Sequence, residues 1–202
     1  QKLDEMAAPR DGQRSLILNP AMNASLLQGF GGLFNPGAPV SKGYTSGMFQ
    51  SAFGLDVNMD QNVSRHLNGT AVQGTNTING AGQSGATITT AALNGTVTVG
   101  SVFTIAGVNA VNPQSRQDTG SLQQFVVVAS AAAATTSLQI FPAIVASGAF
   151  QTVTASPANG AAITFLGAGG AAYDANVMYH RDAFTLAMVP MSVPDVGTRA
   201  KV

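Results

Sequence analysis

The pattern of apolar and polar residues is clearest over Val97–Ser130, where two apolar runs flank a polar segment. The runs Val102–Ala106 and Gln124–Ala129 are rich in Val, Phe and Ile, which suit the pleated surface of a sheet, and Gly, Asn and Pro stand near their ends. Each run therefore predicts a buried strand. The polar segment Asn112–Gly120 predicts the connection between them. We expect these two strands to form the centre of the fold.

The same β-type composition extends from Arg65 to about Gly170. Three Asn-Gly pairs, which begin at Asn79, Asn94 and Asn159, separate apolar runs, and this dipeptide is the strongest short hairpin signal. The alanine run at residues 131–134 lies between two strands and predicts a turn. The spacing fits a small antiparallel sandwich or barrel. The predicted strands are Ala86–Thr90, Val97–Ala106, Gln124–Ala129, Ser137–Ile140, Gln151–Ser156 and Ile163–Leu166.

The first 66 residues hold most of the charge and the convincing helical patterns. Pro20 suits the first turn of a helix, and Asn19 before it is a preferred N-cap residue. Apolar residues alternate with polar ones in Gly54–Val63, which predicts a strand with one wet face. These elements indicate part of an α/β layer. The other predictions are the end of a helix at Lys2–Ala8 stopped by Pro9, a strand at Ser15–Asn19, a helix at Pro20–Gln28 ended by Gly29, Gly31 and Gly32, and a second short helix at Tyr44–Phe53.

Residues 171–202 regain charge. The pattern of Tyr173–Met178 is ambiguous. Asp182–Met191 is a long apolar run that predicts a strand, ended or kinked at Pro190. Asp195–Val202 predicts no regular element.

Composition limits the classes of function. Of 202 residues, 45% are hydrophobic and 9% are charged, against about 25% charged in ordinary soluble proteins. Nine basic and nine acidic residues cancel, so no net field attracts nucleic acid or an anionic membrane. Low charge gives little protection against association, so we expect other subunits to cover much of the surface. The many Ser, Thr, Asn and Gln residues could also solvate a monomer.

The absence of cysteine excludes disulfides and thiolate metal sites. The sequence shows no signal-peptide pattern and no apolar run of about 18 residues. It looks like a soluble, intracellularly made piece of a longer protein.

Three patterns suggest chemistry, and each has a simpler explanation. Gly80–Gly85 has the G-x-G-x-x-G spacing of a dinucleotide site, but a β-type run follows where that motif needs a helix, which favours a loop. Asp56–Asp60 begins like a calcium loop but lacks the later glycine and glutamate. His180 and Asp182 could join a serine in a triad, but no G-x-S-x-G motif supports it. We expect no catalytic residue, no metal and no cofactor.

Longer passages carry a family resemblance. They read RSLILNPAMNASLL, GLFNP, GLDVNMDQNVSRH, GSVFTIAGVNAVNPQSRQDTGSLQQFVVVA, GAFQTVTASPANGAAITFLG and NVMYHRDAFTLAMVPM. In this order, from Arg14 to Met191, they strongly resemble a tailed-bacteriophage major capsid protein of the P-22-like coat protein family.

This resemblance implies an α+β, β-rich chain with part of the Hong Kong 97-type capsid fold and an inserted antiparallel β-barrel domain. Residues 1–66 would be part of the α/β axial domain, 67–170 the inserted barrel, and 171–202 the strand returning to the shell body and the tail. A complete member would also carry an N-terminal arm, an extended loop and a long spine helix before residue 1, and more peripheral sheet after residue 202.

The implied function is that of a structural protein, the major capsid subunit, which self-assembles into the icosahedral head that encloses the phage genome. The implied partners are copies of itself in hexamers and pentamers, together with scaffolding and portal proteins. The implied location is the virion capsid, assembled in the bacterial cytoplasm. Neither sequence-specific nucleic acid nor a membrane is expected as a partner.

Charged residues could fix the register between subunits by pairing, which sets specificity more than strength. Plain solvation explains them equally well, since exposed ion pairs contribute only about 0–1 kcal/mol. The candidate subunit-contact residues are Arg10, Arg14, Asp56, Asp60, Arg65, Arg181 and Asp182.

Two other classes of function stay open. The first is a monomeric β-barrel binding module, such as a decoration protein, a tail protein or a carbohydrate binder. Sugar-binding sites usually expose aromatic rings, and a chain with no Trp and three Tyr fits that poorly. The second is an enzyme, which the motif analysis disfavours.

Overall fold

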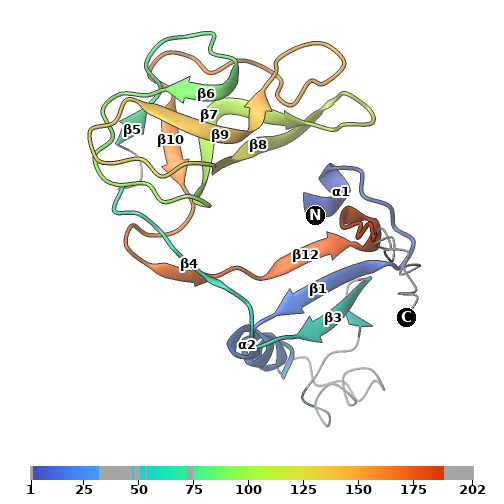
Figure 1. The fold of residues 1–202 in the computed structure, drawn as a ribbon. Coiled ribbons are helices and arrows are strands. Elements are labelled where there is room, and N and C mark those ends of the chain that lie inside the picture. Colours follow the sequence, from blue (N-terminus) through green and yellow to red (C-terminus); the bar gives the residue numbers. More distant parts are fainter. Residues whose placement is uncertain (1, 32–46, 48–50, 53, 72–74, 189–202) are drawn as a thin grey trace, which may run out of the picture.

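The computed structural model describes residues 2–31, 47, 51–52, 54–71 and 75–188, and Figure 1 shows how they are arranged. This part of the chain is rich in β-strands and has few helices, as the sequence predicts. The elements are α1 (Lys2–Glu5), β1 (Arg14–Leu18), α2 (Pro20–Gly31), β2 (Ser51–Ala52), β3 (Leu55–Met59), β4 (Arg65–Leu67), β5 (Asn76–Thr77), β6 (Gly85–Thr89), β7 (Val102–Val111), β8 (Asp118–Val127), β9 (Ser137–Ile144), β10 (Ala162–Phe165), β11 (Ala172–Asp174), β12 (Val177–His180) and the 3-10 helix η1 (Arg181–Ala183).

Strands from early and late parts of the chain form a four-stranded sheet in the order β12-β1-β3-β2. Strand β1 lies parallel to β3 and antiparallel to β12. Leu18 and Val57 are buried against Leu16 and against Leu26 and Leu27 of α2. Helix α2 therefore packs on this sheet.

Helix α2 begins where the sequence predicts. The Asn19 side-chain oxygen accepts a hydrogen bond from the Met22 backbone N at 2.8 Å, which is the N-cap interaction. The predicted end is wrong, because the helix continues through Gly29 to Gly31; a glycine inside a helix costs only about 1 kcal/mol. The predicted helix at Tyr44–Phe53 lies mostly outside the described residues. Within it, Ser51–Ala52 are instead strand β2, because their backbone pairs with β3.

A six-stranded antiparallel sheet, in the order β5-β10-β7-β8-β9-β6, curves into a barrel (Figure 1). Its two edge strands meet through a bridge between Ile78 and Thr90. Beside this bridge the backbone N of Asn79 donates to Thr89 O at 3.1 Å. This contact joins the two edges and so reduces the number of unpaired backbone groups there.

Buried apolar side chains from β6 to β10 fill the barrel. The ring of Phe103 lies with its centroid 5.7 Å from that of Phe125 and 5.5 Å from that of Phe165. In β9, Leu138 and Ile140 are buried while their polar neighbours are exposed. The period-two pattern of the sequence therefore separates interior from surface.

Strands β7 and β8 form the longest pairing of the described residues, with ten residues each. The two strands predicted at the centre of the fold are confirmed, but their bounds differ. Strand β7 begins at Val102 rather than Val97, and the polar connection shrinks to residues 112–117. Gly107 and Gly120 have φ of +77° and +72°, a conformation that glycine adopts without strain. The β7–β8 register shifts on either side of Asn109, near both glycines.

The Asn-Gly pairs do not make this main hairpin. Gly80 and Gly160 have positive φ, as turns require. Gly95 instead lies against other backbone, where an added Cβ would come within 2.7 Å of Ala71 N. The β7–β8 turn uses Asn112, whose side-chain oxygen accepts hydrogen bonds from the backbone N atoms of Gln114 and Ser115. The turn predicted at residues 131–134 is confirmed.

Two predicted strands are wrong. Gln151–Ser156 contributes one isolated bridge, from Val153 to Ala110, because its hydrogen bonds switch between two neighbouring segments. Asp182–Met191 begins within η1, and residues 184–188 have no strand partner in the described part of the chain; 189–191 lie outside it. The strand that returns to the sheet is β12, which pairs with β1.

Strands β4 and β11 pair as a two-stranded ribbon. The chain leaves the four-stranded sheet after β3, passes through β4 into the barrel, and returns through β11 to β12 (Figure 1). The barrel is therefore formed by the segment between β3 and β12.

Candidate functional site

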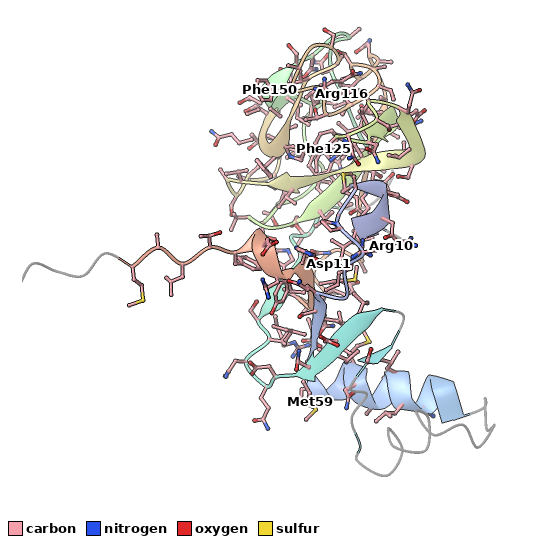
Figure 2. All side chains as sticks on the ribbon, turned by 90° about the vertical axis from the view of Figure 1, so that its right-hand side faces the viewer. Arg10, Asp11, Met59, Arg116, Phe125 and Phe150 are labelled. Atoms are coloured by element: carbon pink, nitrogen blue, oxygen red, sulfur yellow. The ribbon has the colours of Figure 1, made fainter. Side chains whose placement is uncertain are left out.

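A network of charges lies where the chain runs from α1 to β1, and Figure 2 shows Arg10 and Asp11 between the barrel and the sheet. Arg14 at the start of β1 is buried. Its Nη1 donates to Asp4 Oδ1 at 2.7 Å, and the same oxygen accepts from Arg10 Nε at 2.8 Å. The two guanidinium groups, Arg10 first, hold the pKa of the Asp4 carboxyl far below its usual range. Two of the predicted contact residues thus meet on one carboxylate of the same chain.

His180 at the end of β12 is buried beside this network. Its Nε2 lies 3.1 Å from both carboxylate oxygens of Asp11, and its Nδ1 accepts a hydrogen bond from the backbone N of Asp182 at 3.2 Å. Because Nδ1 accepts, the proton is on Nε2 and is donated to Asp11. Both ring nitrogens of His180 therefore have hydrogen-bond partners, and neither partner is a serine. His180 and Asp182 do not form a catalytic triad with a serine.

The backbone N–H of Gln13, and then His180, hold the pKa of Asp11 below its usual value. Asp4 and Asp11 were not among the residues singled out from the sequence. No local motif marks them, because Arg14 and His180, which bind them, come from β1 and β12 and are brought to them only once the sheet has formed.

The remaining candidate residues are exposed and do not gather at one place. Arg65 Nε lies 3.2 Å from Asp174 Oδ1 across the ribbon. Asp56 lies exposed on β3, and Asp60 accepts a hydrogen bond from the Asn62 backbone N after that strand. Arg181 and Asp182 form a loose pair, with Nε and Oδ1 3.8 Å apart.

An exposed apolar segment follows η1. Within residues 184–188, here called the apolar strap, the side chains of Phe184, Leu186 and Met188 are 70%, 84% and 82% exposed. Figure 2 shows this segment extending away from the body of the chain. The sequence marked the segment as apolar, but its pattern could not distinguish a buried strand from an uncovered one.

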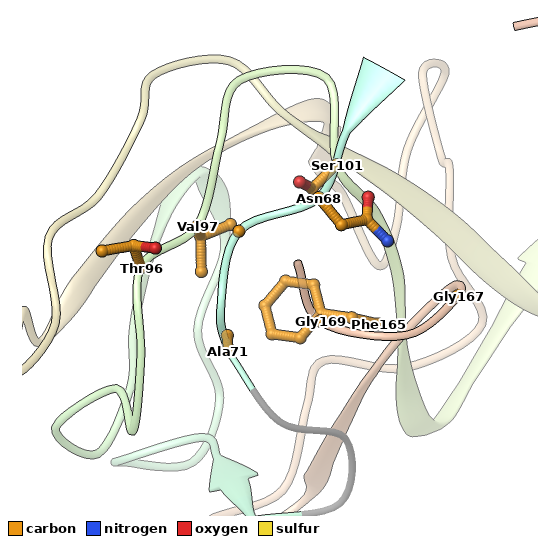
Figure 3. A pocket seen from close by; sticks show the side chains of 9 residues that line it. Asn68, Ala71, Thr96, Val97, Ser101, Phe165, Gly167 and Gly169 are labelled. Carbon is orange, nitrogen blue, oxygen red and sulfur yellow. The ribbon is translucent and has the colours of Figure 1, made fainter. Parts of the chain in front are cut away.

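Described residues line a groove and a small cavity. A groove of about 390 Å³ lies beside α1, and Met6, Val111 and Phe150 are among its lining residues. Its one charged lining residue, Arg116, donates through Nη1 to Gly148 O at 2.7 Å. The second cavity, of about 10 Å³, lies beside Phe165 (Figure 3) and is about the size of one water molecule.

Neither cavity collects ionisable groups around a space for a substrate. Among the residues that the structure describes, no three His, Cys, Asp or Glu side chains are placed to hold a metal ion. No helix in the same residues is long and apolar enough to cross a membrane. Residues 80–84 form a loop that leads directly into strand β6 at Gly85, without the helix that the dinucleotide motif needs.

Residues 2–200 match the family described as P22 coat protein, gene protein 5. The chain belongs to the P22 coat protein family. A solved structure, the CUS-3 coat protein I-domain, is 30% identical to it; the match covers 53% of this chain and 98% of that one, with a TM-score of 0.33. The comparison with curated proteins finds no match. The predicted family is confirmed, and membership gives the chain a structural role in a phage capsid.

We expect the Asp4 carboxylate to stabilise the fold at neutral pH and to lose that effect in acid. Its pKa is lowered from an ordinary value of 3.8, so the unfolded state binds the proton first and stability falls as pH drops below about 4. Urea unfolding of the wild type and of Asp4→Asn, from about pH 6 to about pH 2, should show a difference that shrinks below about pH 4. The exposed Asp56→Asn is the control. A difference at Asp4 that stays constant over this range would contradict the account.

Proposed function

We propose that this chain is part of a major capsid subunit that self-assembles into the icosahedral head of a tailed bacteriophage and encloses its genome. In this proposal it adopts part of the Hong Kong 97-type fold, with residues 1–66 in the axial domain, 67–170 as the inserted barrel, and 171–202 returning to the shell body. Membership of the coat protein family supports the assembly role. The path of the chain from β3 through the barrel to β12 supports the insertion.

The observation that carries the proposal is the apolar strap. Three large apolar side chains within five residues are mostly exposed to water, although the Phe184 ring also contacts the edge of Tyr179, with ring centroids 5.3 Å apart. Burying such a side chain fully contributes about 1.5–3 kcal/mol. A neighbouring subunit is the occupant that assembly supplies, because one heterologous contact repeats around a closed ring. Weak contacts repeated over a shell add to a stable cage.

Charge pairs would set the register of these contacts. Arg14 is buried and bound within its own chain, so its placement favours an internal role. The six other candidates, Arg10, Asp56, Asp60, Arg65, Arg181 and Asp182, are exposed. Exposed charges change specificity and association rate more than affinity.

The proposal includes further partners. A shell of this kind requires scaffolding and portal proteins and is assembled in the bacterial cytoplasm. It requires no catalytic step from the coat subunit. Family membership supports these inferences.

Removing the apolar side chains of the strap should prevent assembly without unfolding the subunit. The variant combines Phe184→Ser, Leu186→Ser and Met188→Ser in the complete coat protein, expressed with its scaffolding protein. Electron microscopy and sedimentation should show closed shells for the wild type and at least about tenfold fewer for the variant, since a loss of about 1.4 kcal/mol per contact already changes association tenfold. The far-UV circular dichroism should not change, because these residues lie outside both apolar cores.

The matched control carries Val99→Ser and Val128→Ser, at exposed apolar positions on the barrel, and should assemble normally. Shells at wild-type yield from the strap variant would contradict the proposal. Discrete monomers of the wild type in the presence of scaffold would favour a β-barrel binding module instead.

A charge swap at Arg65 distinguishes two roles of this residue, a contact between subunits and an ion pair within one chain. Arg65→Glu breaks the pair with Asp174, and Arg65→Glu combined with Asp174→Lys restores a pair of reversed sign across the same two strands. If Arg65 fixes the register between subunits, both variants lower the particle yield or change the particle shape. Recovery in the double variant would assign Arg65 an internal role, and unchanged particles in both would indicate plain solvation.

A further inference from the structure

The ribbon of β4 and β11 is by itself a weak connection between the barrel and the four-stranded sheet. Each of its strands has three residues, and five of the six are exposed, His66 being half-buried. A two-stranded ribbon is marginally stable in water. Parts of a chain joined through a small interface move relative to one another by default. Single hydrogen bonds tie the ribbon to each part, such as Thr98 Oγ1 to Leu67 O at 2.7 Å on the barrel side and Asn19 N to Asn176 Oδ1 at 2.9 Å on the sheet side. A second contact, away from the ribbon, would restrict the orientation of the barrel further.

Helix α1 supplies that contact on the barrel side. The Glu5 carbonyl oxygen accepts a hydrogen bond from Asn112 Nδ2 at 2.9 Å, and Glu5 Oε2 accepts one from Ser121 Oγ at 2.9 Å. The next residue, Met6, lines the groove together with Val111 of β7. All three partners belong to the β7–β8 hairpin. Figure 1 shows α1 between the barrel and the end of the sheet.

Arg14 holds the same segment on the sheet side. Besides Nη1 on Asp4, its Nε donates to Pro9 O at 2.8 Å and its Nη2 to Ala8 O at 2.5 Å. These carbonyls follow α1, where backbone oxygens lack partners within the helix. The guanidinium donors form a rigid planar fork, so three bonds from one group fix the position of the segment. Arg14 is 8% exposed, which limits competition from water.

We propose that residues 2–14 form a tether that fixes the orientation of the barrel relative to the sheet, with Arg14 as the positioning residue that locks it. Asp4 and Glu5 are adjacent in sequence but bind opposite sides: Asp4 binds Arg14 of the sheet, and Glu5 binds the barrel. The two apolar cores share no residue, so each part keeps its fold when the tether loosens. This inference concerns a single chain and goes beyond the proposed function, and its test needs no assembled shell.

The distance between two spin labels measures the orientation. The chain has no cysteine, so Asn58→Cys on β3 and Ser147→Cys in the loop after β9 place one label in each part at exposed positions. The labelled chain, diluted with unlabelled chain, should give a narrow distance distribution by pulsed electron paramagnetic resonance. Arg14→Met removes the three hydrogen bonds and keeps a long side chain. It should widen the distribution roughly twofold or more, because a barrel joined to the sheet only through the small ribbon is restrained less than one held at two places.

Arg10→Met is the matched control. Arg10 also binds Asp4, but it is exposed and makes one side-chain hydrogen bond among the described residues, so its loss should leave the distribution narrow. Glu5→Ala combined with Met6→Ala removes the side-chain contacts of the tether with the barrel and leaves the bond from Asn112 Nδ2 to the carbonyl of residue 5 in place. It changes neither the sheet nor the barrel, and it should also widen the distribution. This second variant decides the question if Arg14→Met does not fold. Narrow distributions in the folded tether variants would overturn the inference.

Discussion

Between His66 and Tyr173 the chain carries two charged side chains, Arg116 and Asp118, so ion pairs cannot hold the barrel together. Its stability comes instead from the apolar interior around Phe103 and from the backbone bonds that link its strands. Asp118 acts locally. Hydrogen bonds from Asn109 Nδ2 and then the Gly120 backbone N lower its pKa, and they lie where β7 and β8 diverge.

In the proposed account, the charges at the junction of α1 and β1 fix the shape of the subunit, and the apolar strap drives association. At the junction, one carboxylate and one guanidinium join α1 to β1. Such bonds are directional and suit the positioning of one part against another. Apolar contact has no direction but contributes free energy in proportion to the area buried. In this account the apolar strap supplies free energy for assembly, and the charged junction fixes the shape of the subunit.

Local sequence patterns correctly predicted elements that have one apolar face and one polar face. Alternation identified β3, and the residue pair Asn19-Pro20 located the start of α2. Sequence patterns did not predict the structure of segments whose apolar residues can be either buried in a sheet or exposed at the surface. The run from Asp182 has the composition of a strand, but its described part lies uncovered, and no feature of a single sequence reports whether a partner covers it.

The charged residues show the same limit. Arg14 is among the candidate subunit-contact charges of the sequence analysis, yet its partners are the backbone oxygens of residues 8 and 9 and the carboxylate of Asp4. That arrangement requires α1 to fold back against β1. Glu5 likewise meets Ser121, which is 116 residues away. The family resemblance came from ordered passages along the chain and did not depend on placing any of these contacts.

Hydrogen–deuterium exchange on free subunits and on assembled shells tests the central claim most directly, namely that the strap is covered by a neighbouring copy. The account predicts that amides of residues 184–188 exchange rapidly in the free subunit and become strongly protected in shells, while those of the exposed barrel loop at 147–150 exchange at similar rates in both. Equal, rapid exchange of the strap in free subunits and in intact shells would contradict it.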